Sequence, residues 1–150
     1  MAQSYVNLLY HVVFSTKDRE PLISEARQPR LYEYIGGIVR KQGGVALAIN
    51  GMEDHVHLFA KLRQDKALSD MIRDLKAHSS GWMHKVFPDL KDFTWQKGYG
   101  AFTVSASQVG SVKRYIEQQK LKHKERTFKD EFVSFLRANE VEFDERYLWQ

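Results

Sequence analysis

The amino-acid sequence predicts an α+β domain with a ferredoxin-like βαββαβ sandwich, in which an antiparallel sheet carries helices on one face and further C-terminal helices follow. Apolar runs of strand length alternate with helical stripes in the order strand, helix, strand, strand, helix, strand, helix. The 150 residues are 43% hydrophobic and 28% charged, the balance of one globular domain. No repeat or linker divides the chain, so we expect one domain over residues 1–150 that includes a C-terminal helical extension at residues 127–150.

The opening strand and the first helix follow from composition and periodicity. Residues 4–16 are rich in β-branched and aromatic side chains and too continuously apolar for a solvated edge, so they predict a buried strand. A charged turn at residues 17–20 closes it. From about residue 29 to residue 42, apolar side chains recur at helical spacing, and a Gly-Gly pair then supplies the permissive backbone that ends a helix.

The middle of the chain predicts a hairpin and a second helix. Two short apolar runs, residues 45–50 and 55–62, flank residues 51–54, which have the length and composition of a hairpin loop. A second apolar stripe extends over residues 68–86 at helical spacing, and Pro88 stops it.

The last third of the chain predicts one strand and two helices. Residues 93–105 are typical of a strand, although two glycines interrupt it. Ser107 can cap a helix that runs to about Lys124. Thr127 can cap another helix, whose apolar stripe is rich in phenylalanine.

Charge and cysteine content restrict the chemistry. The formal net charge is +4, the pI is about 9.2, and the 23 Lys and Arg side chains could neutralise phosphates if several share a face. The chain has no cysteine, so any metal needs His, carboxylate, amide or water ligands. No signal peptide or transmembrane run is evident, which makes a cytoplasmic protein the simplest expectation.

A His-x-His triplet lies in the third predicted strand. Because side chains alternate along a strand, His55 and His57 project from one face and Val56 from the other. Residues two apart in a strand are about 6 to 7 Å apart at the backbone, a span that two imidazoles can bridge through one ion. Taken alone, such a triplet is more often a pair of half-exposed histidines without a ligand.

A tyrosine and a glutamine share one face of a predicted helix. Tyr115 and Gln119 are four residues apart and are therefore neighbours on that face. A tyrosine, whose ordinary pKa is about 10, can attack phosphorus when its ionisation is assisted and the developing charge is neutralised, and a divalent ion can do both. Taken alone, a packing role for Tyr115 and a solvated Gln119 are the commoner interpretations.

Together these motifs resemble the HUH single-tyrosine transposases of the insertion-sequence 200/605 group and their REP-associated relatives. The resemblance covers nearly the whole chain. It runs from residues 10–17 (YHVVFSTK) through residues 54–58 (DHVHL) to residues 112–119 (VKRYIEQQ). It implies a ferredoxin-like fold with the His-x-His strand in the centre of the sheet and the tyrosine helix packed beside it.

The resemblance also implies a function. In that family the two histidines and the glutamine hold a divalent metal, Mg²⁺ or Mn²⁺, and these positions match His55, His57 and Gln119. The family nucleophile matches Tyr115. The implied reaction cleaves single-stranded DNA at hairpin transposon ends, gives a 5′-phosphotyrosine and a free 3′-hydroxyl, and rejoins the DNA to another strand. Family members commonly form homodimers, whereas REP-associated relatives can act as monomers.

Basic and aromatic residues around the proposed site predict DNA contacts, because cations would hold the backbone and rings would stack on unpaired bases. The expected DNA-binding residues are Lys17, Arg19, Arg63, Arg73, Lys76, Trp95, Lys97, Lys113 and Arg114. Trp82 lies on a helical stripe, so we expect it in the core. The histidines without an evident ligand partner are expected to be structural or solvent-facing: His11, His78, His84 and His123.

Two other functions stay open. A histidine-triad nucleotide hydrolase has a His-x-His-x-His strand that overlaps His55 and His57, but Phe59 occupies the place of the third histidine. The second alternative is a domesticated DNA-binding protein that kept the fold and lost transposition, since function resides in sites and not in folds.

Overall fold

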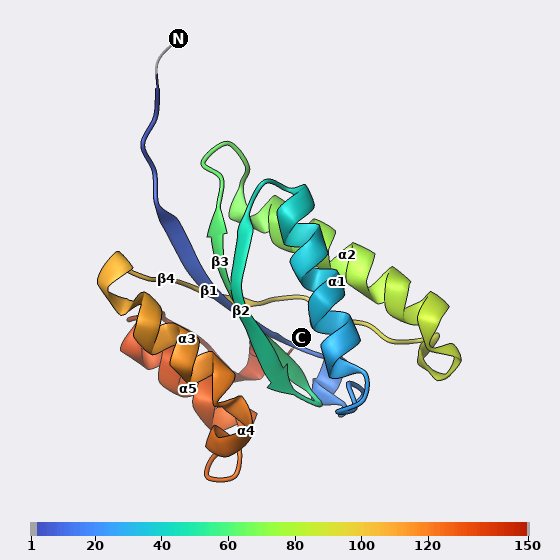
Figure 1. Ribbon diagram of the computed structural model, residues 1–150. Coiled ribbons are helices and arrows are strands. Elements are labelled where there is room, and N and C mark those ends of the chain that lie inside the picture. Colours follow the sequence, from blue (N-terminus) through green and yellow to red (C-terminus); the bar gives the residue numbers. More distant parts are fainter. Residues whose placement is uncertain (1–2, 150) are drawn as a thin grey trace.

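Four strands form one antiparallel sheet in the computed structural model, which describes residues 3–149 (Figure 1). The strands are β1 (Leu8–Ser15), β2 (Val45–Met52), β3 (His55–Leu62) and β4 (Gly100–Thr103). Their spatial order is β2-β3-β1-β4, so β3 and β1 are central, and each neighbouring pair is antiparallel. This order confirms the predicted ferredoxin-like α+β fold.

Helices cover both faces of the sheet (Figure 1). The two helices of the βαββαβ unit lie on one face, as predicted, and the C-terminal helices that follow this unit lie on the other face. The helices are α1 (Gln28–Lys41), α2 (Leu68–Val86), α3 (Val109–Glu117), α4 (Gln119–Lys122) and α5 (Phe128–Ala138). Both faces are covered because β3 is buried on each side along most of its length. Val56 and Leu58 join the core under α1 and α2, whereas Phe59 packs with Ile116 of α3 on the opposite face.

Short 3₁₀ turns connect these elements, at Lys17–Arg19, Pro88–Leu90, Ala106–Gln108 and Glu145–Tyr147. Across the part of the chain that the structure describes, no helix is long and apolar enough to span a bilayer. Residues 1, 2 and 150, which belong to the predicted single domain and its extension, lie outside the described residues.

The β2–β3 hairpin closes more tightly than predicted. The bounds of β3 match the prediction, but Gly51 and Met52, expected in the loop, pair with Val56 and His55 as part of β2. A turn of two residues remains. A Cβ atom on Gly51 would lie 2.1 Å from the carbonyl oxygen of His55, so this close pairing requires glycine.

β1 and β4 are shorter than the strands predicted over residues 4–16 and 93–105. β1 begins at Leu8, where its partner β3 ends. β4 has only four residues, and before it an isolated bridge joins Trp95 to Thr16. A strand therefore extends only as far as a neighbouring strand can pair with it. An apolar run can be longer, because it includes residues whose side chains reach the core without strand pairing.

The helix predicted to run to about Lys124 is interrupted at Gln118, whose φ of −96° and ψ of 18° are not helical. The side-chain amide of Asn50, on β2, donates hydrogen bonds of 2.9 Å to the carbonyl of Ile116 and 3.3 Å to that of Glu117. It satisfies carbonyls in the last turn of α3 and holds the end of this helix against the sheet.

The two predicted helix caps have different outcomes. Ser107 does not cap α3, because Gln108 occupies the N-cap position and the Ser107 hydroxyl pairs with that of Ser105 at 3.1 Å. Thr127 caps α5 as predicted, since its side chain accepts a hydrogen bond of 3.2 Å from the backbone N–H of Asp130.

Candidate active site

β3 presents two imidazoles to the sheet face that α3, α4 and α5 cover. His55 and His57 alternate with Val56 along the strand, and both are completely buried. The predicted shared face is confirmed, and the interpretation of two half-exposed histidines is wrong for this chain. On the neighbouring β1, Ser15 pairs with His55 and Val13 with His57, so the pair sits in the interior of the sheet.

The ring nitrogens that face away from α3–α5 have fixed partners. His55 Nδ1 lies 2.7 Å from the Asp54 carboxylate, and His57 Nδ1 lies 2.8 Å from Nε2 of His11, on β1. These contacts turn the Nε2 atoms of His55 and His57 toward the helices, as partners of metal-binding histidines commonly do. His11, which we expected to be structural or exposed, is therefore a buried residue that supports this pair.

Burial keeps the supporting imidazoles neutral. It lowers the pKa of His11 to about 3, with a smaller contribution from the neighbouring His57. It also lowers the pKa of His57 to about 4, against the opposing effect of a hydrogen bond to Glu131. Both rings are therefore uncharged at neutral pH, which is the form of histidine that can bind a metal.

The α3–α4 segment brings the predicted tyrosine and glutamine to these histidines. Gln119 is completely buried, and its Oε1 atom lies 3.1 Å from His55 Nε2. Tyr115 is partly buried, and its hydroxyl donates a short hydrogen bond to the carboxylate of Glu131. Gln119 Nε2 donates to the same carboxylate at 3.0 Å. All four predicted residues thus meet around one point, although the helix is interrupted between Tyr115 and Gln119.

Glu131, on α5, is the centre of this arrangement and was missed in the sequence. Its Oε1 atom lies 2.9 Å from Nε2 of His57, 3.2 Å from Nε2 of His123 and 3.6 Å from Nε2 of His55. His123, for which the sequence showed no evident ligand partner, lies beside this carboxylate and could be a further metal ligand. A signal was present, because Glu131 is an acidic residue within the apolar stripe of phenylalanines on α5, where burial requires partners.

The carboxylate is ionised in spite of its burial. Burial alone would raise the pKa of Glu131, but the hydrogen bonds from His123 and His57 lower it far below its ordinary value. The same carboxylate raises the pKa of His123, although burial of that ring opposes the change. Burial, followed by the hydrogen bond and charge of Glu131, raises the pKa of Tyr115, so its phenol is protonated at neutral pH.

The donor set fits a divalent ion. His55, His57, His123 and Glu131 each offer one ligand atom, and these four atoms lie within 4.8 Å of one another. Gln119 Oε1 lies beside them, 3.0 Å from Nε2 of His123. Neutral imidazoles, one carboxylate and one amide oxygen are ligands used by first-row divalent metals, and the oxygen ligands also suit Mg²⁺.

α5 covers the site with aromatic rings. Phe128 stacks on His55 with ring centres 4.0 Å apart. Phe135 lies edge-on to Tyr115 at 5.5 Å and contacts His57 at 6.1 Å. Both histidines are completely buried, whereas Tyr115 is partly exposed and lies nearer the surface.

The predicted DNA-binding cations fall into separate groups. Lys113 and Arg114 lie on α3, directly before Tyr115. Arg73, Lys76 and Lys97 line a cavity of about 430 Å³ beside α2, which is on the other face of the sheet.

The remaining predicted cations lie near turns. Lys17 and Arg19 belong to the 3₁₀ turn after β1, and the Arg19 guanidinium lies 4.8 Å from the centre of the Trp149 ring. Arg63 follows β3 and pairs with Asp65 at 2.5 Å. The predicted cations therefore do not share one face around the histidines.

Several of these cations already have partners. Arg73 pairs with Asp70 and Asp74, each at 3.2 Å. Lys76 is partly buried and donates to the backbone carbonyls of Gln96 at 2.8 Å and Gly98 at 2.5 Å. Desolvation lowers its pKa to about 8. Lys76 is therefore held by the fold, whereas Arg73 pairs with carboxylates at the surface.

Trp95 is a core residue, so the prediction that its ring stacks on DNA bases was wrong. The side chain is only 7% exposed and lies edge-on to Phe14 and Phe93, with ring centres 4.8 and 4.9 Å apart. Its indole N–H donates to the hydroxyl of Ser79 at 2.9 Å. A side chain buried to this extent leaves no ring face on which a base could stack.

Replacing Trp95 with alanine should therefore lower the free energy of unfolding by about 3 to 5 kcal/mol, because it creates a cavity in the core. Urea denaturation followed by circular dichroism measures this change. Tyr5→Ala, at a side chain that is 84% exposed, is the control and should change stability by less than about 0.5 kcal/mol. A similarly small effect of Trp95→Ala would contradict the core assignment.

The sequence matches the family described as IS200-like transposase over residues 4–119. The ISDra2 transposase TnpA of Deinococcus radiodurans is 27% identical over 117 residues, which cover 75% of this chain and 84% of that protein. The transposase for insertion sequence element IS200 of Salmonella typhimurium is 28% identical over 130 residues, which cover 79% of this chain and 81% of that protein.

Solved structures show the same fold. A Deinococcus radiodurans crystal structure described as a transposase superposes with a TM-score of 0.65 at 28% identity, covering 79% of this chain and 96% of that one. A REP-associated tyrosine transposase bound to a REP hairpin gives a TM-score of 0.61 at 17% identity, covering 82% and 73%, a likeness of fold alone. Because the family match spans most of the sequence and includes His55, His57, Tyr115 and Gln119, this chain belongs to the IS200-like transposase family.

Proposed function

We propose that this protein cleaves and rejoins single-stranded DNA at transposon ends through a 5′-phosphotyrosine intermediate in a metal-dependent HUH site. The observation that carries the proposal is the convergence of the Tyr115 hydroxyl and the Gln119 amide with the two imidazoles of β3 around the Glu131 carboxylate. Membership of a transposase family supports DNA recombination as the setting of this chemistry.

Tyr115 is the nucleophile in this proposal. Its oxygen attacks a backbone phosphorus, the Tyr–O–P bond forms, and the bond from phosphorus to the 3′ oxygen breaks. The leaving oxygen takes up a proton and becomes a free 3′-hydroxyl, while the phenol proton departs. Because the phosphotyrosine conserves the phosphodiester energy, the 3′-hydroxyl of another strand can attack it in the reverse sense and restore Tyr115.

The residues that would hold the metal are His55, His57 and Gln119, with Glu131 and His123 as additional donors. A bound Mg²⁺ or Mn²⁺ supplies positive charge that polarises the non-bridging phosphate oxygens and offsets the charge developing on phosphorus.

The chain itself prepares this chemistry through fixed contacts. Asp54 and His11 orient the two imidazoles of β3, so that the Nε2 atoms face the reacting groups. Glu131 accepts the hydrogen bond from the Tyr115 hydroxyl, which orients the phenol oxygen. Burial and Glu131 favour the protonated phenol, so the phenol has to lose its proton when the oxygen attacks.

The proposed substrate is single-stranded DNA with hairpin ends. A fold relative solved with a REP hairpin supports this choice, as does the formal net charge of +4. Lys113 and Arg114 precede Tyr115 on α3 and are the predicted cations nearest to the nucleophile in sequence.

We also propose that the protein is a homodimer in the cytoplasm. Each subunit would be one domain, with residues 127–150 as its C-terminal helical extension.

The proposed function is tested with hairpin-ended single-stranded DNA and Mn²⁺. The transposase should form a DNA–protein adduct that survives denaturation in detergent, and mass spectrometry should locate the phosphodiester on Tyr115. A domesticated DNA-binding protein would retard the DNA in a gel without an adduct. A histidine-triad hydrolase would hydrolyse nucleotides and form no adduct. The buried Phe59, which occupies the place of the third histidine, argues against this alternative.

Replacing Glu131 with glutamine should lower the affinity for Mn²⁺ at least about tenfold, because it removes the anionic donor while preserving the size of the side chain. Titration of free Mn²⁺ by electron paramagnetic resonance measures the affinity. Glu142→Gln, at an exposed position, is the matched control and should leave it unchanged. Equal affinity of Glu131→Gln and the unaltered protein would exclude this carboxylate as a ligand.

A further inference from the structure

A break in the helical segment separates Tyr115 from Gln119, and the local sequence does not explain it. Glutamate and glutamine are good helix formers, and residues 117–119 are Glu-Gln-Gln, without glycine or proline. Gln118 nevertheless has a φ of −96° and a ψ of 18°, so α3 ends before it and α4 begins after it. The position of the Gln119 amide relative to the Tyr115 phenol therefore depends on the tertiary contacts that hold this break.

Asn50 of β2 supplies such a contact at the break itself. Its side-chain amide donates to the carbonyls of Ile116 at 2.9 Å and Glu117 at 3.3 Å. In a continuous α-helix the Glu117 carbonyl would accept from the N–H of Leu121. That N–H donates to the carbonyl of Gln118 at 3.0 Å. Asn50 thus provides a donor to a carbonyl that the break deprives of its helical partner.

Asn50 also stands next to the proposed metal ligands. It pairs directly with His57 in the β2–β3 register. Residues directly opposite each other on antiparallel strands project from the same face of the sheet. One side chain therefore connects the strand neighbour of a ligand imidazole to the helix that carries Tyr115, so the contact sets how that helix lies over the histidines.

A second contact holds α4 on the other side of the break. Lys120, directly after Gln119, donates from Nζ to Oε1 of Gln28 at 2.8 Å. Gln28, the first residue of α1, is buried, and its own Nε2 donates to the carbonyl of Ile23 at 3.0 Å. Because α1 and α4 lie on opposite faces of the sheet, the Lys120–Gln28 contact passes around the edge strand β2 (Figure 1). Both side chains border one cavity together with Asn50.

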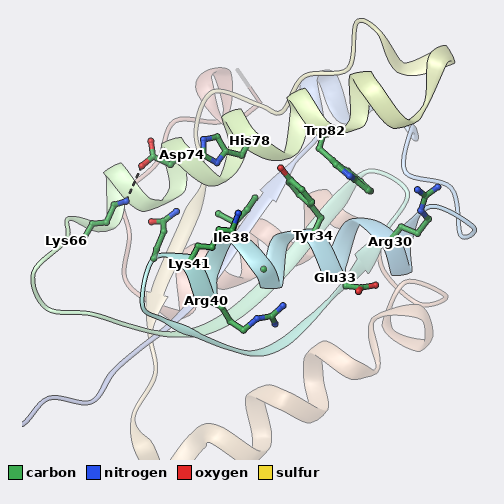
Figure 2. Close-up of a pocket in the computed structure, with 12 residues that line it drawn as sticks. Arg30, Glu33, Tyr34, Ile38, Arg40, Lys41, Lys66, Asp74, His78 and Trp82 are labelled. Atoms are coloured by element: carbon green, nitrogen blue, oxygen red, sulfur yellow. Dashed lines mark hydrogen bonds and ion pairs between the residues drawn. The ribbon is translucent and has the colours of Figure 1, made fainter.

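The helix that carries Gln28 is a fixed support. Leu31 and Ile35 of α1 are completely buried in the core. The helix also packs on α2, where Tyr34 and Trp82 stack with ring centres 4.8 Å apart and an interplanar angle of 13° (Figure 2). We expected Trp82 in the core, but its ring is only partly buried and borders a cavity between the two helices. A contact to Gln28 therefore ties α4 to a helix that is itself held on two sides.

We propose that Asn50 is a positioning residue for DNA cleavage. It holds the break between α3 and α4, so that Tyr115 and Gln119 converge on the imidazoles of β3, and the Lys120–Gln28 contact secures α4 in that position. Asn50 acts through the helix and not on the substrate. Its effect on the cleavage rate rests on the proposed function, whereas its effect on the break does not.

The first test measures the break without DNA or metal. Asn50→Ala and Asn50→Asp both remove the amide donor, and Asn50→Asp keeps the shape of the side chain. In both variants α3 and α4 should join, so the carbon-13 chemical shift of Gln118 Cα should move to the helical range in an NMR spectrum. Asn139→Ala and Asn139→Asp are matched controls, because the Asn139 amide donates at 2.9 Å to a carbonyl at the end of α5. An unchanged Gln118 shift in both Asn50 variants would overturn the proposal.

The second test separates catalysis from binding. At saturating hairpin DNA and Mn²⁺, the single-turnover cleavage rate of the Asn50 variants should fall on the order of 10- to 100-fold, since small misplacements of reacting groups have effects of this size. The affinity for DNA, measured by fluorescence anisotropy, should stay unchanged, as should both quantities in the Asn139 variants. A loss confined to DNA affinity, or equal losses in the Asn50 and Asn139 variants, would refute the positioning role.

Lys120→Met keeps both tests available if neither Asn50 variant folds, because Lys120 is exposed. It should move the Gln118 shift in the same direction and lower the cleavage rate to a smaller extent. No change in either quantity would then overturn the proposal. Absence of an adduct in the unaltered protein would refute the proposed function, and the Gln118 shift alone would then decide whether Asn50 holds the break.

Discussion

Replacement of Tyr115 with phenylalanine should abolish the covalent DNA–protein adduct, a loss on the order of 10³-fold or more in the rate of cleavage. The substitution removes the phenol oxygen, which donates to Glu131, and leaves the ring in place against Phe135. The fold should survive, because the ring packs as before. Adduct formation on labelled hairpin DNA with Mn²⁺, quantified after denaturing electrophoresis, measures the effect.

Tyr147→Phe provides the matched control, since that side chain is 59% exposed and lies in the C-terminal 3₁₀ turn. Its adduct yield should equal that of the unaltered protein. The nucleophile assignment fails if Tyr115→Phe still forms an adduct at a comparable rate. A loss of adduct together with a loss of DNA binding would show instead that the phenol holds the substrate.

Replacement of His57 with alanine should have the second-largest effect, a loss of about 10²-fold or more in Mn²⁺ affinity and a matching loss in cleavage at low metal concentration. His57 is completely buried, contacts both His11 and Glu131, and offers Nε2 to the other ligand atoms. Calorimetric titration with Mn²⁺ measures the affinity.

His78→Ala is the control for this second substitution, because His78 is exposed on α2 and takes no part in the ligand cluster. Its Mn²⁺ affinity should not change. Circular dichroism establishes that His57→Ala is folded, and His57→Gln offers a polar replacement if the alanine variant is not. A folded His57 variant with full Mn²⁺ affinity would remove this imidazole from the proposed site.

The elements that the sequence predicted best are those whose bounds depend on the local sequence alone. β3 is a short, largely apolar run that follows a tight turn, so its bounds were correct. The bounds of α2 were also correct, because its apolar stripe is long and Pro88 follows it. The errors occurred where a contact with a residue distant in the sequence sets the end of an element. For example, Asn50 of β2 donates hydrogen bonds to the carbonyls at the end of α3.

The same distinction applies to the candidate site. Alternation along a strand placed His55 and His57 together, and helical spacing placed Tyr115 near Gln119. Glu131 could not be deduced in this way, because only the packing of α5 on the sheet brings it to the histidines. It also lies beyond residue 119, where the motifs that carry the resemblance and the family match both end.

The complete burial of His55 and His57 beneath Phe128 has a kinetic consequence for any ion held there. Bulk water and chelators have no direct path to these two imidazoles while α5 stays in place, so we expect complete release of the ion to require a local opening of this helix. With ample chelator, release would then proceed at a rate set by the opening and independent of chelator concentration. The residence time of the ion would then measure the rate at which α5 opens, and not the affinity of the ligands for the ion.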